Sequence, residues 1–137
     1  MRPSTCGPRK LRFTAEYLVD DDCAFCKIIS GKEQATIVSS WRDAIAFVPL
    51  GEVTDGHTLV VPRAHVADAS SSPVITGMVA THAAQYAQAL NEDYNLITSS
   101  GPAATQTIRH LHFHVVPRRK GDGLRLPWSQ CSCDCTV

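Results

Sequence analysis

The sequence lacks an excess of charge of either sign. Its 137 residues include 13 Lys and Arg against 13 Asp and Glu, so the formal net charge is zero. Proteins that bind mainly nucleic acid or an acidic membrane surface carry an excess of basic residues. We therefore expect neither partner, although backbone donors and a few side chains could still hold a small phosphate ligand.

Long apolar runs are also lacking. No stretch approaches the roughly 20 apolar residues of a membrane-spanning helix, and residues 1–13 have basic side chains without the apolar segment of a secretory signal. There is no internal repeat. These absences predict a soluble, cytoplasmic protein with one domain that is large enough to bury a core.

Cysteine, in contrast, is abundant, with six residues. Without a secretory signal, metal binding is a stronger interpretation than a disulfide framework. Cys23 and Cys26 have a spacing that suits one tetrahedral ion, but a complete site needs two more nitrogen or sulfur ligands. His65 and His110 are candidates. The alternative is that both cysteines are buried apolar thiols.

The feature that points most directly to function is the segment from His110 to Pro117, which reads His-Leu-His-Phe-His-Val-Val-Pro. Residues i, i+2 and i+4 of a strand share one face, so three imidazoles are expected on one side and the apolar residues between them in the core. A fold gains nothing from three aligned imidazoles. Histidine titrates near neutral pH and suits nucleophilic, acid–base and metal-ligand roles, so the pattern predicts a functional site.

If His110 binds a metal, His112 and His114 remain for chemistry. A neutral imidazole nitrogen can attack phosphorus when its other ring nitrogen is fixed by an acceptor. His57, at the start of an expected strand, could meet these two histidines.

The loop before the histidine segment, residues 101–107, is small and polar. It could offer backbone N–H groups, the Gln106 amide and the Thr107 hydroxyl to phosphate oxygens. The same composition is ordinary turn chemistry, so only its position beside the histidines gives it weight.

The order of expected elements predicts an α+β fold. Ser72 followed by Pro73 is typical of a helix start, and this helix is expected to reach about Leu90. A shorter helix is expected to end at Gly31. Short connections favour an antiparallel sheet with the long helix on one face. Strands are expected at residues 35–39, 44–48, 58–61, 94–99 and 111–116.

The domain is predicted to span residues 22–120. Residues 1–21 are predicted to be a poorly ordered N-terminal extension, and residues 121–137 a C-terminal tail. The tail carries Trp128, which could line a pocket or pack on its own sheet. It also carries three alternate cysteines, whose spacing does not match the first pair: Cys131, Cys133 and Cys135.

Three segments of the chain, in this order, resemble the histidine triad (HIT) family, in particular its zinc-containing bacterial, Hint-like branch. The segments are Cys23–Gly31, Gly56–Pro62 and His110–Pro117, and the resemblance spans about residues 22–119. It implies an antiparallel sheet of about five strands with one long and one short helix, in a protein that typically forms homodimers. It also implies attack on the α-phosphorus of a nucleoside phosphoramidate or dinucleoside polyphosphate.

The resemblance implies roles for individual residues. His112 would be the nucleophile and form a nucleotidyl-histidine that water resolves. His114 would assist beside the phosphate, and His57 would hydrogen-bond within the histidine cluster and help fix the tautomer of His112. The positions that contact substrate match Ser99, Gln106 and Thr107. A structural zinc ion would be held by Cys23, Cys26, His65 and His110.

The chain departs from the family pattern at two positions. Pro49 stands where many relatives have an aspartate that contacts ribose hydroxyls, and Ser99 stands where an asparagine is common. These departures bear on nucleotide preference rather than on the type of reaction. They favour either an unusual substrate or a second interpretation, a nucleotide-binding regulatory or partner-binding protein with little turnover. A third interpretation, a zinc clip without chemistry, leaves His57, His112 and His114 unexplained.

Overall fold

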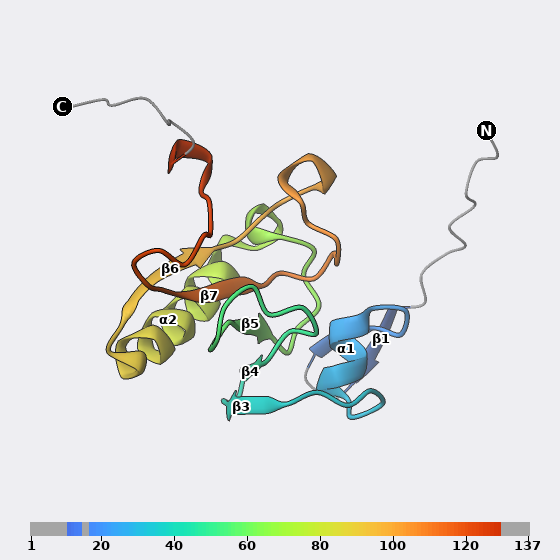
Figure 1. Ribbon diagram of the computed structural model, residues 1–137. Helices are drawn as coiled ribbons and strands as arrows, with labels where there is room; N and C mark the ends of the chain where they lie inside the picture. Colours follow the sequence, from blue (N-terminus) through green and yellow to red (C-terminus); the bar gives the residue numbers. More distant parts are fainter. Residues whose placement is uncertain (1–10, 15–16, 130–137) are drawn as a thin grey trace.

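The computed structural model describes residues 11–14 and 17–129. Its centre is a five-stranded antiparallel sheet with strand order β3-β4-β5-β7-β6, and a separate hairpin precedes it (Figure 1). The hairpin consists of β1 (Leu11–Thr14) and β2 (Tyr17–Asp20). The sheet consists of β3 (Ile37–Ser40), β4 (Ala44–Phe47), β5 (Thr58–Pro62), β6 (Asp93–Ile97) and β7 (Phe113–Arg118). The two helices are α1 (Ala24–Ile29) and α2 (Pro73–Leu90).

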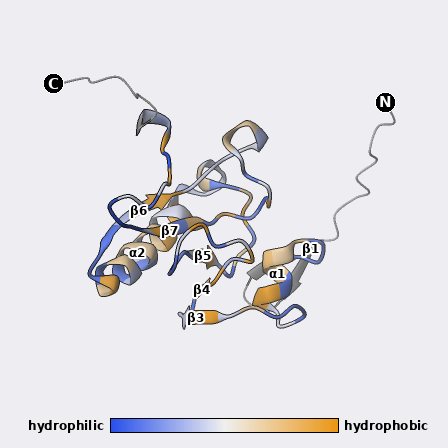
Figure 2. Cartoon of the chain, in the orientation of Figure 1, coloured by the Kyte–Doolittle hydropathy of each residue, from blue (hydrophilic) through white to orange (hydrophobic). Residues whose placement is uncertain are grey.

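The two central strands β4 and β5 are buried on both faces, because alternate residues serve two separate cores. Ile45 and Phe47 pack with α1, whereas Ala46 and Val60 pack with α2. Figure 2 shows that hydrophobic residues gather on α1 and on β3. The sheet is therefore the middle layer, with the short helix on one side and the long helix on the other.

Helix α2 packs closely on the sheet because small residues face it. Its buried positions recur every four residues, which places them on one stripe of the helix: Val79, Ala83 and Ala87. The Ser72 side chain accepts a hydrogen bond from the Ile75 N–H at the first turn, and Asn91 ends the helix in the left-handed conformation. These local signals fix the ends of the element that covers this face.

The register between β5 and β7 decides on which face of the sheet each residue of β7 lies. His114 pairs with Leu59, and Phe113 pairs with Val60. Because Leu59 belongs to the core beside α1 and Val60 to the core beside α2, His114 lies on the α1 face. Leu111 and Val115 pack beneath α2, which confirms the expected alternation.

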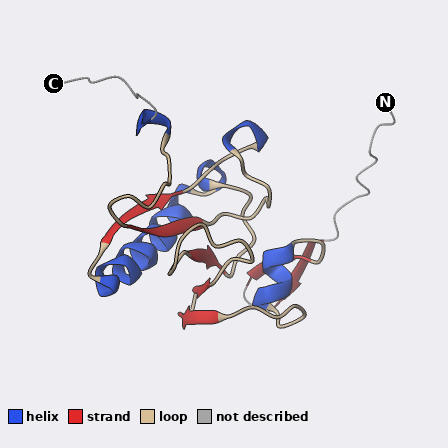
Figure 3. Ribbon diagram, viewed as in Figure 1, coloured by secondary structure: helices blue, strands red, loops and turns tan. Residues whose placement is uncertain are grey.

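The expected fold class is confirmed, with helices and strands in the expected order (Figure 3). The five expected strands begin within two residues of their predicted starts, the long helix begins at Pro73, and the short helix ends at Ile29, close to the predicted Gly31. Two features differ. The segment predicted to be an unstructured extension contains the β1–β2 hairpin, whose sequence is rich in apolar and aromatic residues. Strand β7 begins at Phe113, so His110, which lies in a bend, and His112 precede the strand. Across the described residues, neither helix combines the length and apolar character that crossing a membrane would require.

Candidate active site and metal centre

Four predicted metal ligands converge although they come from three parts of the chain. Cys23 and Cys26 lie at the start of α1, His65 follows β5, and His110 precedes β7. One ligand atom of each residue lies within 4.8 Å of the others. The cluster is buried except at His65, which is partly exposed.

The spacing of these atoms fits a tetrahedral zinc ion. The Nδ1 atoms of His65 and His110 are 3.2 Å apart, and the sulfur–nitrogen distances from Cys23 to His110 and from Cys26 to both histidines are 3.4 to 3.5 Å. Zinc bonds of about 2.3 Å to sulfur and about 2.05 Å to nitrogen give tetrahedral edges of about 3.3 Å and about 3.5 Å. Since two thiolates and two imidazoles are also the preferred donors of zinc, the residues fit this metal.

Outer contacts orient the two histidines of the cluster. The Nε2–H of His110 donates to the Pro62 carbonyl at 2.8 Å, which leaves Nδ1 as its ligand atom. The Nε2 of His65 lies 3.8 Å from the buried Asp20 carboxylate. The Cys26 thiol lowers the pKa of Cys23 by hydrogen bonding to it, so Cys23 is poised to be a thiolate.

A pocket of about 850 Å³ opens on the α1 face of the sheet. Its lining includes the apolar side chains of Phe25, Phe47 and Leu59 and the imidazoles of His112 and His114. Phe25 meets His112 edge-on, with ring centroids 5.2 Å apart. The remaining lining residues are Ala24, Ile28, Glu33, Gln34, Ala35, Thr36, Val48, Pro49, Leu50, Gly51, Val53, His57, Thr107 and Ile108.

The tautomer of His112 follows from its partner. Its Nδ1 lies 2.7 Å from the His110 carbonyl oxygen, which can only accept, so Nδ1 carries the proton. In the neutral ring the lone pair is then on Nε2. His112 is buried, with 7% of its surface exposed, so this lone pair belongs to a side chain held in one place.

A second chain of contacts fixes the tautomers of His57 and His114. The Val53 N–H donates to Nδ1 of His57 at 3.2 Å, so neutral His57 carries its proton on Nε2. That Nε2 lies 2.9 Å from Nδ1 of His114 and donates to it. Neutral His114 therefore carries its own proton on Nε2. His57 thus forms a hydrogen bond within the histidine cluster, as expected, but its partner is His114. The tautomer of His112 follows from the His110 carbonyl.

Burial keeps these three imidazoles neutral. Desolvation lowers the pKa of His57, and Glu52 opposes this shift in part. Desolvation also lowers the pKa of His112. The pKa of His114 is lowered to about 4, first by desolvation and then by His112 and His57. At neutral pH the pocket therefore presents a nucleophilic nitrogen and an N–H donor side by side.

The polar loop after β6 is held in place by the side chain of Gln106. The Gln106 amide donates to the Ala67 carbonyl at 2.7 Å and accepts from the Gly101 N–H at 2.9 Å. Because Gln106 is only 5% exposed, these contacts show it closing the loop. Thr107 lines the pocket, and Ser99 is partly buried. Direct contact of Ser99 and Gln106 with a substrate stays a prediction.

Sequence reasoning missed one anchor of this loop. Asp68 is buried and accepts hydrogen bonds from Ser100, Ser70 and Ser71 at 2.8 to 3.0 Å. These donors, Ser100 first, lower the pKa of the Asp68 carboxyl. The run Asp-Ala-Ser-Ser-Ser predicts a helix N-cap made by neighbouring residues. It does not indicate that Asp68 also accepts a hydrogen bond from the distant Ser100.

Two further side chains lie apart from the pocket, those of Trp128 and His82. Trp128 is 76% exposed, so it packs neither in the pocket nor on the sheet of this chain. His82 on α2 stacks on Trp41 and contacts Asp43 at 2.8 Å. The tail cysteines lie outside the described residues.

Comparison with known proteins gives a family match and related sequences. A family model described as the HIT domain matches residues 30–121. An uncharacterized HIT-like protein of Methanocaldococcus jannaschii, MJ0866, is 36% identical over 108 residues, which cover 74% of this chain and 82% of that protein. The adenosine 5′-monophosphoramidase HNT1 of Saccharomyces cerevisiae is 30% identical over 121 residues, which cover 85% of this chain and 76% of that protein.

Solved structures show the same fold. A HIT family protein from Bacillus anthracis superposes with a TM-score of 0.72 at 35% identity, covering 79% of this chain and 82% of that one. A zinc-bound histidine triad family protein from Mycobacterium smegmatis superposes with a TM-score of 0.65 at 34% identity, covering 77% of this chain and 81% of that one.

Proposed function

The chain belongs to the HIT domain family, and from this premise we propose that it is a nucleotide hydrolase or nucleotidyl transferase that acts through His112. The proposal extends to this chain the activity named for the yeast phosphoramidase relative. Its substrate would be a nucleoside phosphoramidate or a dinucleoside polyphosphate. Thr107, which lines the pocket, would contact the phosphate, together with Ser99 and Gln106.

The observation that carries the proposal is the hydrogen bond from His112 Nδ1–H to the His110 carbonyl. It leaves the Nε2 lone pair of a neutral imidazole for attack. In the proposed first step, Nε2 bonds to the α-phosphorus while the bond from phosphorus to the leaving group breaks. The leaving group takes the bonding pair and a proton from the solvent, which the second step returns, and the His110 carbonyl stabilises the positive charge that develops on the ring.

In the second step water attacks the phosphorus, and the bond to Nε2 breaks. The electron pair returns to His112 and the proton of the water is released, which gives the free nucleoside monophosphate. His114 offers its Nε2–H to an oxygen of the phosphoryl group in both steps, because His57 occupies its Nδ1.

We further propose that Cys23, Cys26, His65 and His110 hold a structural zinc ion. The tetrahedral spacing of their donor atoms supports this assignment, as does the zinc-bound relative from M. smegmatis. With four protein ligands the ion would have no open position for water. Its contribution would be to fix the segment that carries His112.

The test is hydrolysis of adenosine 5′-phosphoramidate by the wild type and by His112→Asn. We expect turnover in the wild type and a loss of about 10³-fold or more in the variant, because removal of a nucleophile abolishes the covalent route. His82→Asn is the matched control, since it removes a histidine that contacts Trp41 and Asp43 instead of the pocket. Equal turnover in the wild type and His112→Asn would exclude the proposed mechanism.

A further inference from the structure

The loop between β4 and β5 carries His57 and forms one wall of the pocket, with Pro49, Leu50 and Val53 among the lining residues. Its last turn is closed by two internal contacts. The His57 N–H donates to the Thr54 carbonyl at 3.1 Å, and the Val53 N–H donates to the His57 ring at 3.2 Å. The position of this turn therefore decides whether a backbone N–H meets Nδ1 of His57.

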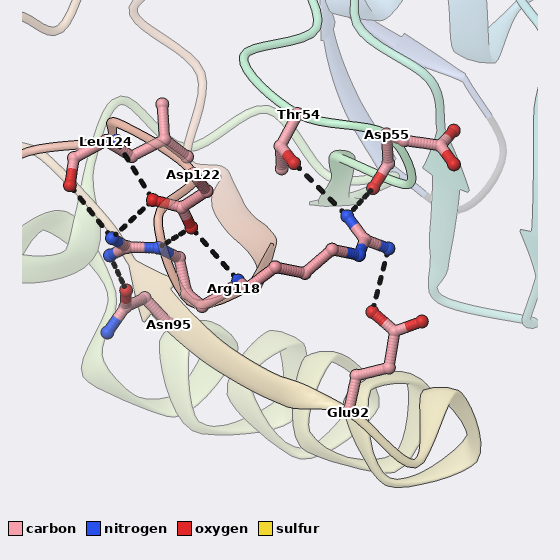
Figure 4. Close-up of polar contacts among 8 residues, drawn as sticks. Thr54, Asp55, Glu92, Asn95, Arg118, Asp122 and Leu124 are labelled. Carbon is pink, nitrogen blue, oxygen red and sulfur yellow. Dashed lines mark hydrogen bonds and ion pairs between the residues drawn. The ribbon is translucent and has the colours of Figure 1, made fainter.

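A side chain from outside the loop, that of Arg119, holds this turn. Arg119, the residue after β7, donates from Nη1 to the Thr54 hydroxyl at 3.3 Å and to the Asp55 carbonyl at 3.2 Å. Its Nη2 donates to the Glu92 carboxylate at 2.9 Å, between α2 and β6 (Figure 4). The guanidinium thus ties the loop to the end of the strand that carries His114.

The neighbouring arginine is used differently. Arg118 donates to Asn95, to both oxygens of Asp122 and to the Leu124 carbonyl, so it fixes β6 and the turn that follows β7 (Figure 4). The two arginines therefore have different roles. Arg118 orders the end of its own strand, whereas Arg119 contacts the loop that lines the pocket.

We propose that Arg119 is a positioning residue for the hydrogen bond from His57 to His114, acting through the turn of residues 53–57. By holding Thr54 and Asp55 it keeps the Val53 N–H on His57 Nδ1, which keeps the His57 proton on Nε2 and makes His57 the donor to His114. The side chains of Arg119 and Glu92 are 45% and 42% exposed. An exposed ion pair contributes little to stability, so the effect of Arg119 falls on geometry rather than on folding.

The inference rests on the proposed function for its kinetic readout alone. In Arg119→Gln we expect kcat for adenosine 5′-phosphoramidate to fall about tenfold, short of the roughly hundredfold that a 1 Å misplacement can cost. We expect the thermal midpoint of unfolding to change little. Glu92→Gln should shift kcat in the same direction by a smaller factor, because it frees the guanidinium without removing it.

The decisive readout does not need turnover. In ¹⁵N-histidine-labelled protein, the His57 ring nitrogens should show one tautomer in the wild type and a mixture of both in Arg119→Gln. Lys120→Gln is the matched control, since it removes the adjacent positive charge and leaves the Arg119 contacts in place. Arg119→Lys, which keeps the charge and one donor, should lie between the wild type and Arg119→Gln in both measurements.

An unchanged His57 tautomer in Arg119→Gln would overturn the proposal, whatever happened to kcat. So would an equal change in Lys120→Gln, because the effect would then come from charge alone. Absence of turnover in the wild type would reject the proposed function and leave the tautomer measurement as the test of Arg119.

Discussion

At the scale of single residues, hydrogen-bond partners assign a separate part to each histidine of the pocket. His112 faces a carbonyl and keeps a lone pair on Nε2, whereas His114 accepts from His57 and keeps a proton on Nε2. The sequence predicted that these residues would meet. It could not predict the order of donors, because that order depends on the Val53 backbone N–H, which no residue pattern specifies.

Burial of the histidines predicts a dependence of stability on pH. His114 has a pKa of about 4 in the folded protein against 6.5 for the unperturbed side chain. Between these values the unfolded chain binds a proton that the folded protein does not, so stability is full above pH 6.5 and falls as the pH drops towards 4. The slope for one histidine is at most about 1.4 kcal/mol per pH unit.

Urea unfolding at pH 7.5 and at pH 5 checks this expectation. The wild type should lose more free energy of unfolding between the two values than His114→Gln does, since the variant lacks the buried imidazole. Identical losses in both proteins would show that His114 is not held neutral by the fold.

At the scale of elements, two loops position residues of the pocket, and each loop is held by a residue that is distant from it in the sequence. The loop of residues 98–109 rests on Asp68 through Ser100, and the loop before β5 rests on Arg119. Helices and strands were predicted well because their periodicity and caps are local signals. These anchors were not predicted, since a contact such as that of Asp68 with Ser100 joins residues that have no common pattern.

Asp68→Ala should loosen the loop that carries Thr107. Three serine hydroxyls and one backbone N–H would lose the carboxylate that accepts from them, and the loop would sample more positions. We expect KM for adenosine 5′-phosphoramidate to rise several-fold, with a smaller change in kcat because His112 does not contact Asp68. Steady-state kinetics separate the two parameters. A fall confined to kcat would contradict this account of the loop.

At the scale of the whole molecule, the sheet separates a packed core from a face that carries two candidate sites, and one segment of the chain joins these sites. The α2 face is a packed core, while the α1 face carries both the pocket and the Cys and His cluster. Residues 110–114 belong to both sites, because His110 is a candidate metal ligand and its carbonyl fixes His112. The homodimer stays a prediction, which sedimentation of the purified protein would test.

Removal of metal tests how far the fold depends on the cluster. Protein purified without added zinc should contain about one equivalent, and Cys26→Ser should contain less than half. Because metal binding contributes to the free energy of folding, treatment with a chelator should lower the thermal midpoint by at least about 5 °C. Less than half an equivalent in the wild type, as measured by atomic emission, would count against the zinc site.

The most direct measurement of the central claim is capture of the covalent intermediate. The protein is mixed with labelled adenosine 5′-phosphoramidate, the reaction is quenched within milliseconds, and the labelled peptide is identified by mass spectrometry. The account predicts an adenylyl group on His112 and no label in His112→Asn. Turnover without any labelled peptide, or a label on another residue, would contradict nucleophilic attack by His112.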